Sequence, residues 1–444
     1  MCENTLDRTR SMSQLIRFAL PSIIMMTAMG IYTITDTLFV SRLINTDALS
    51  AINIVCPTIN LIIGLSSMLT SGGVALLCRD MGAGRLKKVQ QNAGLLCVCT
   101  VAAGCIIAVF ALLFLNELLQ LLHAEGRILP YARAYLSMLL FFAPFAMLQV
   151  FYQSMFVAAG RPGLGMVLAV CAGGVNVVLD MVFMAGFHMG IEGSALATGI
   201  GYMVPAVCGT VFFIRRKQEE LHFSRPHWDF GMLKESCLNG SSEMVSQLAA
   251  AVTTLLLNTI LFRLYQEEGV AAGTIIIYTQ FLLTSLYIGF SMGAAPLIAY
   301  QYGRRNQQQL SSLIRKCLAV VVLSSVVIFL ITGLLQRPLV GLFSDADSRV
   351  YTIALQGFAI FICSLLFSGF NIFSSALFTA LSNGKLSALI SFSRTFGFYM
   401  LFLCLLPSWI GSEGVWLAIV LAEGCSFLIA LFCIYRYAVV HKTT

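Results

Sequence analysis

The sequence predicts an all-α polytopic membrane protein whose twelve transmembrane helices form two parallel six-helix lobes. The first observation is composition: 58% of the 444 residues are hydrophobic and only 11% are charged, whereas soluble globular proteins have about 25% charged residues. The second is a series of twelve apolar runs, each long enough to cross a bilayer. The third is a repeat that relates the first six runs to the last six.

The apolar runs, interrupted by glycine, proline or charged residues, mark the expected spans. The first run continues from Phe18 to Val40, too long for the apolar region of a cleavable signal peptide, so it is predicted as the first transmembrane helix. No run alternates with a period of two, which excludes the strands of a transmembrane barrel. The expected spans are at about 14–40, 50–78, 92–115, 131–158, 164–186, 192–214, 236–262, 272–300, 313–335, 351–380, 386–408 and 413–437.

Lysine and arginine are distributed unevenly between the connections. With the N-terminus inside, the inner segments hold 20 of the 27 basic residues, the outer segments hold 6, and Arg394 lies within a span. Basic residues are enriched in the cytoplasmic connections of membrane proteins. The distribution therefore predicts that both termini are cytoplasmic.

The longest polar stretch, at 215–235, divides the chain near its middle and prompts a test for internal repetition. A shift of 221 residues aligns the two halves from the first span to the last without gaps. Because each half has six spans, both halves enter the membrane in the same direction and are parallel repeats. We expect an N-terminal lobe over 1–218, a cytoplasmic linker over 219–235 and a C-terminal lobe over 236–444. Aligned identities include Gly72 with Gly293, Gly82 with Gly303, Ser154 with Ser375, and Gly163 with Gly384.

The 14 cysteines are not expected to form a disulfide framework, because most of them lie inside apolar runs. The five histidines are scattered, so no metal site is predicted from Cys and His. We predict small buried hydrophobic residues at Cys97, Cys99, Cys105, Cys171, Cys208, Cys363, Cys404, Cys425 and Cys433.

Two acidic residues of the N-terminal lobe form the strongest candidate site. Asp36 and Asp180 both lie late in outward-running spans, Asn176 precedes Asp180 by one helical turn, and Thr198 lies at a similar depth in the next span. Rocking of two lobes would expose such a site alternately to each side of the membrane. Oxygen ligands suit a small cation, and paired carboxyl groups in a low dielectric also hold a proton. The competing interpretation is a structural polar network between helices.

The C-terminal lobe does not repeat these acids, since the residues at Asp36 and Asp180 are replaced there by leucines. It carries a different pair: Arg394 and Glu423 lie about 13–15 Å into their spans by helical rise. A static ion pair and a coupling element are equally consistent with this depth. Glu243, about two turns into its span, has no assigned role.

The substrate cleft is predicted from residue type alone. An amide in the middle of a span needs a polar partner, which favours Gln153 and Gln280. Methionine suits promiscuous binding surfaces, so Met25, Met29 and Met155 are candidates. Ordinary packing is the competing explanation for each methionine.

Several segments match the pattern of a known family, namely Phe18-Ala19-Leu20-Pro21, Asp36-Thr37-Leu38-Phe39-Val40, 176–180, 190–198, 79–84 and 292–303. In these segments, and over nearly its whole length, the chain resembles the multidrug and toxic compound extrusion (MATE) family, and in particular its bacterial MepA-like and DinF-like branch. Two departures from the family pattern are Gln301, where an asparagine is usual, and Asn239-Gly240-Ser241-Ser242, where the seventh helix usually opens with proline.

The resemblance implies a V-shaped exporter in a bacterial plasma membrane that exchanges Na⁺ or H⁺ for amphipathic, often cationic drugs. It places the cation site at Asp36, Asn176, Asp180 and Thr198, and it associates Pro21 with bending of the first helix. Tolerance of proline near a helix end is the alternative for Pro21. The implied partners are membrane lipid, a small-molecule substrate and the coupling cation. No nucleic acid, no further cofactor and a monomeric state are expected.

Four other classes of membrane protein agree less well with the sequence. A lipid-linked oligosaccharide flippase of the same superfamily would need several cations in its cleft, whereas Arg394 is the one basic residue near the middle of a predicted span. A major facilitator transporter lacks support beyond the Gly-, Asp- and Arg-rich connection at 79–88. A membrane enzyme or receptor would need clustered catalytic or metal-binding residues, and an ATP-driven pump a phosphate-binding loop. The sequence has neither.

Overall fold

The computed structural model describes residues 6–7, 11–216 and 220–440. The helices of the N-terminal half are α1 (Met12–Leu43), α2 (Thr46–Gly82), α3 (Leu86–Leu113), α4 (Leu115–Leu121), α5 (Leu129–Phe141), α6 (Ala143–Ala158), α7 (Pro162–Asp180), the π-helix η1 (Met181–Gly186) and α8 (Ile191–Arg215). Those of the C-terminal half are α9 (Phe230–Gly303), α10 (Gln307–Leu334), α11 (Gln336–Gly341), α12 (Arg349–Phe361), the 3-10 helix η2 (Ile362–Ser364), α13 (Leu365–Ala380), α14 (Gly384–Phe392), the π-helix η3 (Ser393–Gly397), α15 (Phe398–Ile410) and α16 (Ser412–Val440).

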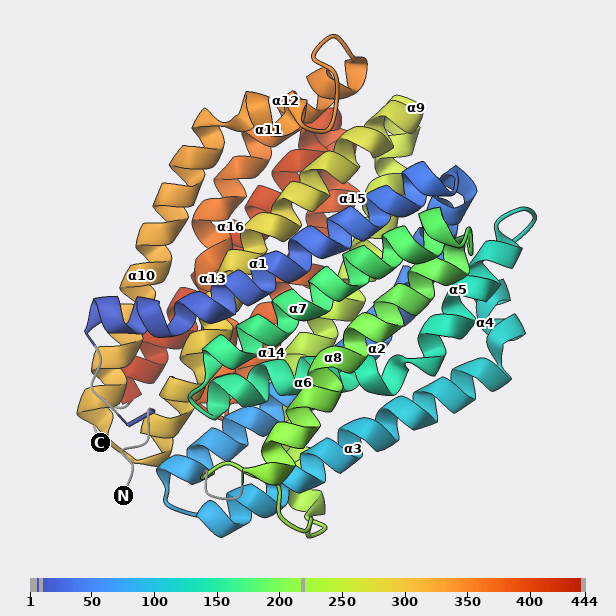
Figure 1. Ribbon diagram of the computed structural model, residues 1–444. Helices are drawn as coiled ribbons and strands as arrows, with labels where there is room; N and C mark the ends of the chain where they lie inside the picture. Colours follow the sequence, from blue (N-terminus) through green and yellow to red (C-terminus); the bar gives the residue numbers. More distant parts are fainter. Residues whose placement is uncertain (1–5, 8–10, 217–219, 441–444) are drawn as a thin grey trace.

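These helices make twelve membrane spans. Ten helices of the described residues are long and apolar enough to cross a bilayer, and the pair α5 and α6, bent by 56°, adds an eleventh. The backbone of the 74-residue α9 leaves the helical conformation at Gln266, where φ is 57°, so α9 supplies two spans. The predicted all-α fold in two six-helix lobes is confirmed, and the long helices lie nearly side by side in Figure 1.

Helix boundaries recur at the interval found in the sequence. The second span of α9 begins after Gln266, 221 residues after the start of α2 at Thr46, and α10 begins at Gln307, 221 residues after Leu86. One prediction is wrong: a loop was expected between the spans ending at 262 and starting at 272, but the chain turns at the single residue Gln266. Polar residues with good helix propensity, Glu267 among them, prolong both helices beyond the apolar run.

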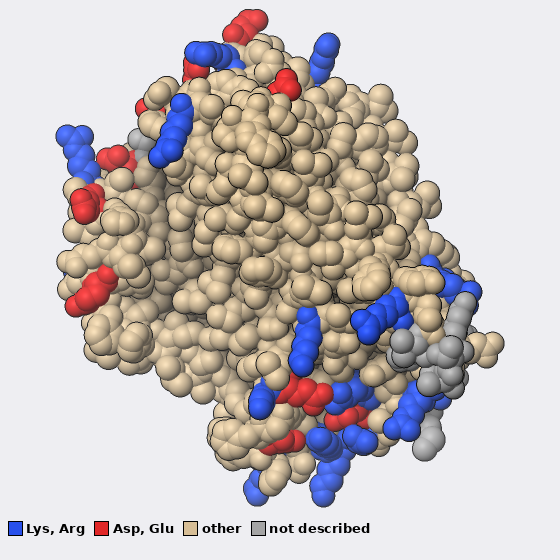
Figure 2. Space-filling model, turned by 180° about the vertical axis from the view of Figure 1, so that it is seen from behind, with Lys and Arg blue, Asp and Glu red and all other residues tan. Residues whose placement is uncertain are grey.

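Charged side chains gather at the two ends of the helix bundle and leave the middle of its surface uncharged. α1 begins and α16 ends at the same end, together with the α2–α3 connection, and we call this the terminal end (Figure 1). Figure 2 shows lysines and arginines gathered with some acids at the ends, separated by a broad belt without charged side chains. That belt is the surface expected against lipid. Arg8, Arg10, Lys217, Lys442 and the expected lobe boundary at 218 lie outside the described residues.

The two lobes are in closest contact in the half of the bundle nearer the terminal end. A Cβ built on Gly72 of α2 would collide with the Ser236 carbonyl oxygen of α9, and one on Gly240 would collide with that of Met68. At Gly289 it would lie 2.7 Å from the Ser22 carbonyl oxygen of α1. The small residues therefore let backbones from different lobes touch, and the lobes are closed at this end.

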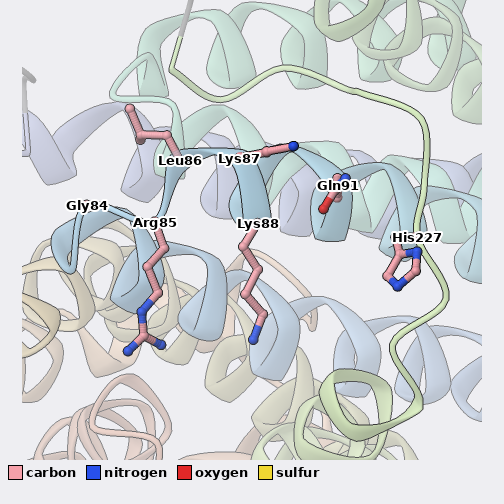
Figure 3. A pocket seen from close by; sticks show the side chains of 7 residues that line it. All are labelled: Gly84, Arg85, Leu86, Lys87, Lys88, Gln91 and His227. Carbon is pink, nitrogen blue, oxygen red and sulfur yellow. The ribbon is translucent and has the colours of Figure 1, made fainter.

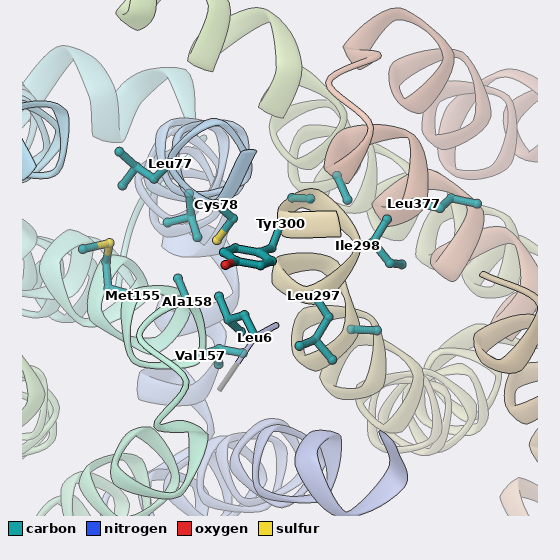
Figure 4. Packing of buried hydrophobic residues seen from close by; sticks show 14 of the residues in the cluster. Leu6, Leu77, Cys78, Met155, Val157, Ala158, Leu297, Ile298, Tyr300 and Leu377 are labelled. Carbon is teal, nitrogen blue, oxygen red and sulfur yellow. The ribbon is translucent and has the colours of Figure 1, made fainter. Parts of the chain in front are cut away.

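Polar and apolar contacts reinforce this closure. Arg79 of α2 forms an ion pair with Glu235 of α9 at 2.8 Å. Leu6, 1% exposed, packs in a hydrophobic cluster drawn from both lobes, with Val157 of α6 and Leu297 of α9 among its members (Figure 4). The departure Gln301 also contributes, because its Nε2 donates to the Leu6 carbonyl oxygen at 3.4 Å.

The cysteines follow the prediction only in part. All 13 cysteines of the described residues are free thiols, and Cys433 is buried as expected. Cys97, Cys99, Cys363 and Cys425 are half-buried. Cys105, Cys171, Cys208 and Cys404 are exposed on helices of the apolar belt, so their predicted burial inside the protein is wrong. Their surroundings are apolar because they face the lipid side of the helices rather than the core.

Candidate functional site

Three helix faces converge on the candidate site of the N-terminal lobe. Asp36 lies in the far half of α1, Asp180 is the last residue of α7, and Thr198 lies in α8. Asn176 shares a face of α7 with Asp180 because the two are four residues apart. α1 and α8 both contact α7. The structure thus brings all four predicted residues into one region of the N-terminal lobe.

Hydrogen bonds fix part of this region. Asn176 Nδ2 donates to Thr198 Oγ1 at 3.2 Å, and Ser194 Oγ donates to Asp36 Oδ1 at 3.1 Å. The Asp36 and Asp180 carboxyl groups lie close enough to interact electrostatically. Since two ionised carboxylates have no hydrogen to share, a direct bond between them requires a proton.

The arrangement leaves acceptor oxygens without donors. Asp180 is fully buried, and neither of its carboxylate oxygens has a hydrogen-bond partner among the residues that the structure describes. Asn176 Oδ1 is also buried and unpartnered. Within the described part of the chain, no basic side chain contributes to the electrostatic surroundings of either acid. A buried carboxylate pair without compensation is unfavourable, so the pair needs a proton or a metal cation.

The donor set fits one proton or one monovalent cation. Two carboxyl groups, an amide oxygen and a hydroxyl supply the hard oxygen ligands that Na⁺ would use, and the three orphaned oxygens are the atoms available to it. Among the described residues no group of three or more His, Cys, Asp or Glu could hold a metal ion. Asp36 is partly exposed whereas Asp180 is fully buried, so an entering cation would meet Asp36 first.

Sequence reasoning missed several residues of this site. Ser194 and Tyr202 share a helix face with Thr198 at four-residue spacing, and Tyr32 precedes Asp36 by one turn. Tyr32 and Tyr202 are near enough to interact electrostatically with Asp36. The spacing was readable in the sequence, but nothing in it distinguished these side chains from ordinary packing.

A π-helix follows the site directly, because η1 begins at Met181, the residue after Asp180. The equivalent span of the other lobe carries its own π-helix, η3, which contains Arg394. Single π-helical turns in long helices are frequent at functional sites. Neither was predictable from the apolar pattern, which is the same for an α-helix and for a short π-helical insertion.

The C-terminal pair is present as an ion pair. Arg394 Nη1 lies 3.3 Å from Glu423 Oε1, and the two side chains are 19% and 6% exposed. Asn371 Nδ2 donates to Glu423 Oε2 at 2.7 Å and to its carbonyl oxygen at 2.9 Å. Arg394 also acts electrostatically on Glu243 of α9. Among the described residues Arg394 therefore has one ion-pair partner, Glu423.

The predicted cleft residues are placed less uniformly. Met25 and Met155 are 1% and 0% exposed and fill the interior of the N-terminal lobe, so the structure does not place them on an accessible surface. Gln153 is also buried, and its Nε2 donates to the Met29 sulfur at 3.0 Å. Met29 and Gln280 are partly exposed.

Pro21 lies inside α1 without interrupting it. The next residue, Ser22, is where α1 crosses α9 at Gly289. A proline removes one hydrogen bond from the helix and weakens it locally. Bending of α1 at this position would therefore change the contact between the lobes.

Comparisons with known proteins agree with this architecture. A family model described as MatE matches residues 21–182 and 244–405, one segment in each lobe. The multidrug export protein MepA of Staphylococcus haemolyticus is 25% identical over 426 residues, covering 95% of this chain and 92% of that protein. MepA of Staphylococcus aureus strain MRSA252 is 23% identical over 425 residues, covering 95% and 93%.

Solved structures share the fold. A crystal structure of a MATE protein in complex with MaL6 superposes with a TM-score of 0.94 at 20% identity and covers 100% of both chains. An outward-facing multidrug resistance MATE transporter gives 0.92 at 20% identity, covering 99% of this chain and 98% of that one. The predicted family resemblance is confirmed. Since the family model matches more than half of the chain, the protein belongs to the MatE family of membrane transporters.

Proposed function

We propose that this transporter exports amphipathic, cationic small molecules in exchange for Na⁺ or H⁺ bound at Asp36 and Asp180. The observation that carries the proposal is the pair of Asp36 with the buried Asp180, whose carboxylate oxygens have no hydrogen-bond donor among the described residues. The names of the MepA relatives, multidrug export proteins, support the substrate class. The uneven distribution of basic residues supports a cytoplasmic terminal end in a bacterial plasma membrane.

The state of the structure suggests where the exchange begins. The lobes are closed at the terminal end by the Gly72–Gly240 crossing and by the Arg79–Glu235 ion pair. A site in the far half of the N-terminal lobe would then take its cation from outside the cell. Neutralising the pair removes the repulsion between the two carboxyl groups and allows α1 and α7 to move together. The substrate would be released outward before or during this step.

The flippase alternative is not favoured by the geometry. Arg394, the mid-span cation that could hold a pyrophosphate group, is already paired with Glu423 at 3.3 Å. Its charge is further compensated by Glu243. A lipid pyrophosphate would have to displace Glu423 from Arg394.

Transport by the purified protein in proteoliposomes tests the proposal. A fluorescent lipophilic cation such as ethidium would be the substrate, with an inward Na⁺ gradient and an inward proton gradient imposed separately. We expect export under at least one of the two gradients and none when both are absent. Export that proceeds at the same rate without either gradient would contradict the proposal.

The membrane potential provides a further control in the same assay. Exchange of one monovalent cation for one singly charged substrate moves no net charge, so an imposed potassium diffusion potential should leave the rate unchanged. A neutral substrate would instead gain about 2.3 kcal/mol from each 100 mV. A cationic substrate whose export responds strongly to potential would contradict one-for-one exchange.

A further inference from the structure

A cavity at the terminal end of α3 has no part in the proposed transport cycle. It has a volume of about 590 Å³ and lies where the α2–α3 connection meets the segment that joins the two lobes (Figure 3). Five of its seven lining residues are polar or basic, and the full set is Gly84, Arg85, Leu86, Lys87, Lys88, Gln91 and His227.

The cations of this cavity are held in place by buried charge. Asp80, 5% exposed, lies 3.5 Å from Arg85 and 3.9 Å from Lys88. Lys88 also lies 3.8 Å from Asp229. Arg85 and Lys88 keep 62% and 48% of their side-chain surface exposed, so they remain available to a ligand. Lys87 has no acidic partner in the part of the chain that the structure describes.

The internal repeat provides a comparison within the same molecule. The equivalent turn before α10 has Asn306, Gln308 and Gln309 at the positions of Arg85, Lys87 and Lys88. There Asn306 Oδ1 accepts from the Gln309 backbone N–H at 3.1 Å and caps the helix. At α3 no side chain makes this capping hydrogen bond. Uncapped N–H groups and three cations at the same turn favour an anion. The C-terminal turn differs, because its two arginines, Arg304 and Arg305, precede a capped helix and Arg304 is paired with Asp7.

The segment between the lobes forms the other wall. Ser224 donates its backbone N–H to the Gln90 carbonyl oxygen at 3.3 Å, and Gln90 Nε2 donates to the Glu220 carbonyl oxygen at 3.2 Å. These bonds hold the segment along α3, so that His227 reaches the cavity. Trp228 and Phe230 follow, 64% and 77% exposed, with stacked rings 6.0 Å apart.

The surroundings point to lipid rather than to a soluble anion. Exposed tryptophan is typical of the boundary between membrane and water, where headgroups lie. From the cavity, α3 continues along the apolar belt and exposes large apolar side chains over its length. These include Val98 at 46%, Ile106 at 68%, Val109 at 58% and Phe110 at 63%.

We propose that this cavity binds the phosphate headgroup of an anionic phospholipid, with the acyl chains along α3. Arg85, Lys87 and Lys88 would contact the phosphate, and Trp228 would lie at the headgroup level. Because the segment carrying His227 joins the two lobes, the lipid would hold that segment against the N-terminal lobe. This inference does not depend on the proposed coupling ion or substrate.

Native mass spectrometry of the purified full-length protein tests the inference. Binding of dioleoylphosphatidylglycerol is compared with that of dioleoylphosphatidylcholine, which has the same chains and no net charge. The test variants are Lys87→Gln and the double variant Lys87→Gln/Lys88→Gln, which copies the glutamines of the α10 turn. Lys87 forms no ion pair in the described structure, so its loss should not disturb folding. Lys385→Gln, at the start of α14, removes an exposed lysine outside the cavity and is the control.

We expect preferential binding of phosphatidylglycerol, weakened about fivefold by loss of one lysine and about 25-fold by loss of both. The Lys385 variant should bind like the unmodified protein, and millimolar inorganic phosphate should not compete. Equal binding of the two lipids would overturn the inference, as would unchanged affinity in the double variant. Displacement by inorganic phosphate would identify a soluble anion site instead.

Discussion

Asp180→Asn is expected to reduce cation-driven export to the level of protein-free liposomes while the protein stays folded. Asparagine has nearly the shape of aspartate and offers N–H donors to Asp36, so the pair no longer needs a proton or metal ion. Removal of an uncompensated buried carboxylate should leave the thermal unfolding temperature unchanged or raise it. Ethidium export under imposed Na⁺ and pH gradients, together with thermal unfolding in detergent, measures both effects.

Two further variants sharpen this prediction. Asp36→Asn should reduce export in the same way, because either substitution leaves only one ionisable carboxyl group at the site. Glu192→Gln removes an exposed acid from the first turn of α8, two residues from Ser194, and should export normally. Normal export by either aspartate variant would show that the pair is a structural polar network and not the coupling site.

Arg394→Leu is expected to cause the largest loss of stability of any single change in the C-terminal lobe. It leaves the Glu423 carboxylate, 6% exposed, without its cation. Breaking a buried ion pair by removal of one partner costs about 3–5 kcal/mol. Glu423→Gln should cost less, because Arg394 retains Glu243 as an electrostatic partner and glutamine can still accept from Asn371.

The double variant Arg394→Leu/Glu423→Gln should recover much of the loss, since no unpaired charge then remains. Thermal unfolding of the four proteins in one detergent gives the coupling between the two positions. Arg263→Leu, which removes an exposed arginine near Gln266, is the control and should change little. Equal losses for the two single variants, without recovery in the double variant, would contradict an ion pair that Glu243 supports.

The sequence alone predicted most of the fold, because lipid imposes strong constraints. A span must be helical and about 20 apolar residues long, so the runs and the 221-residue repeat identified the twelve spans. The turn at Gln266 was missed because apolar length marks the lipid-facing part of a helix and not its end. The π-helices beside Asp180 and at Arg394 leave no trace in hydropathy.

The sequence identified the charged residues of the candidate site, because charged residues are rare inside membrane spans. Asp36 and Asp180 were conspicuous because each acid inside a span is costly. Ser194 was not, since a serine in a helix satisfies its own hydroxyl on the preceding turn as readily as it serves a neighbour. The burial of Met25 and Met155 could not be predicted from residue type, because methionine suits the protein core and a binding cleft equally well.

Sodium binding to the purified protein, measured by isothermal titration at pH 8, 6.5 and 5, tests the central claim most directly. Two close carboxyl groups share their affinity for a proton and for a metal ion, so protons must compete with Na⁺ at this pair. The account predicts that Na⁺ affinity falls as the pH is lowered and that binding is lost in Asp36→Asn/Asp180→Asn. Sodium affinity that is unchanged between pH 8 and pH 5, or binding that survives the loss of both acids, would contradict it.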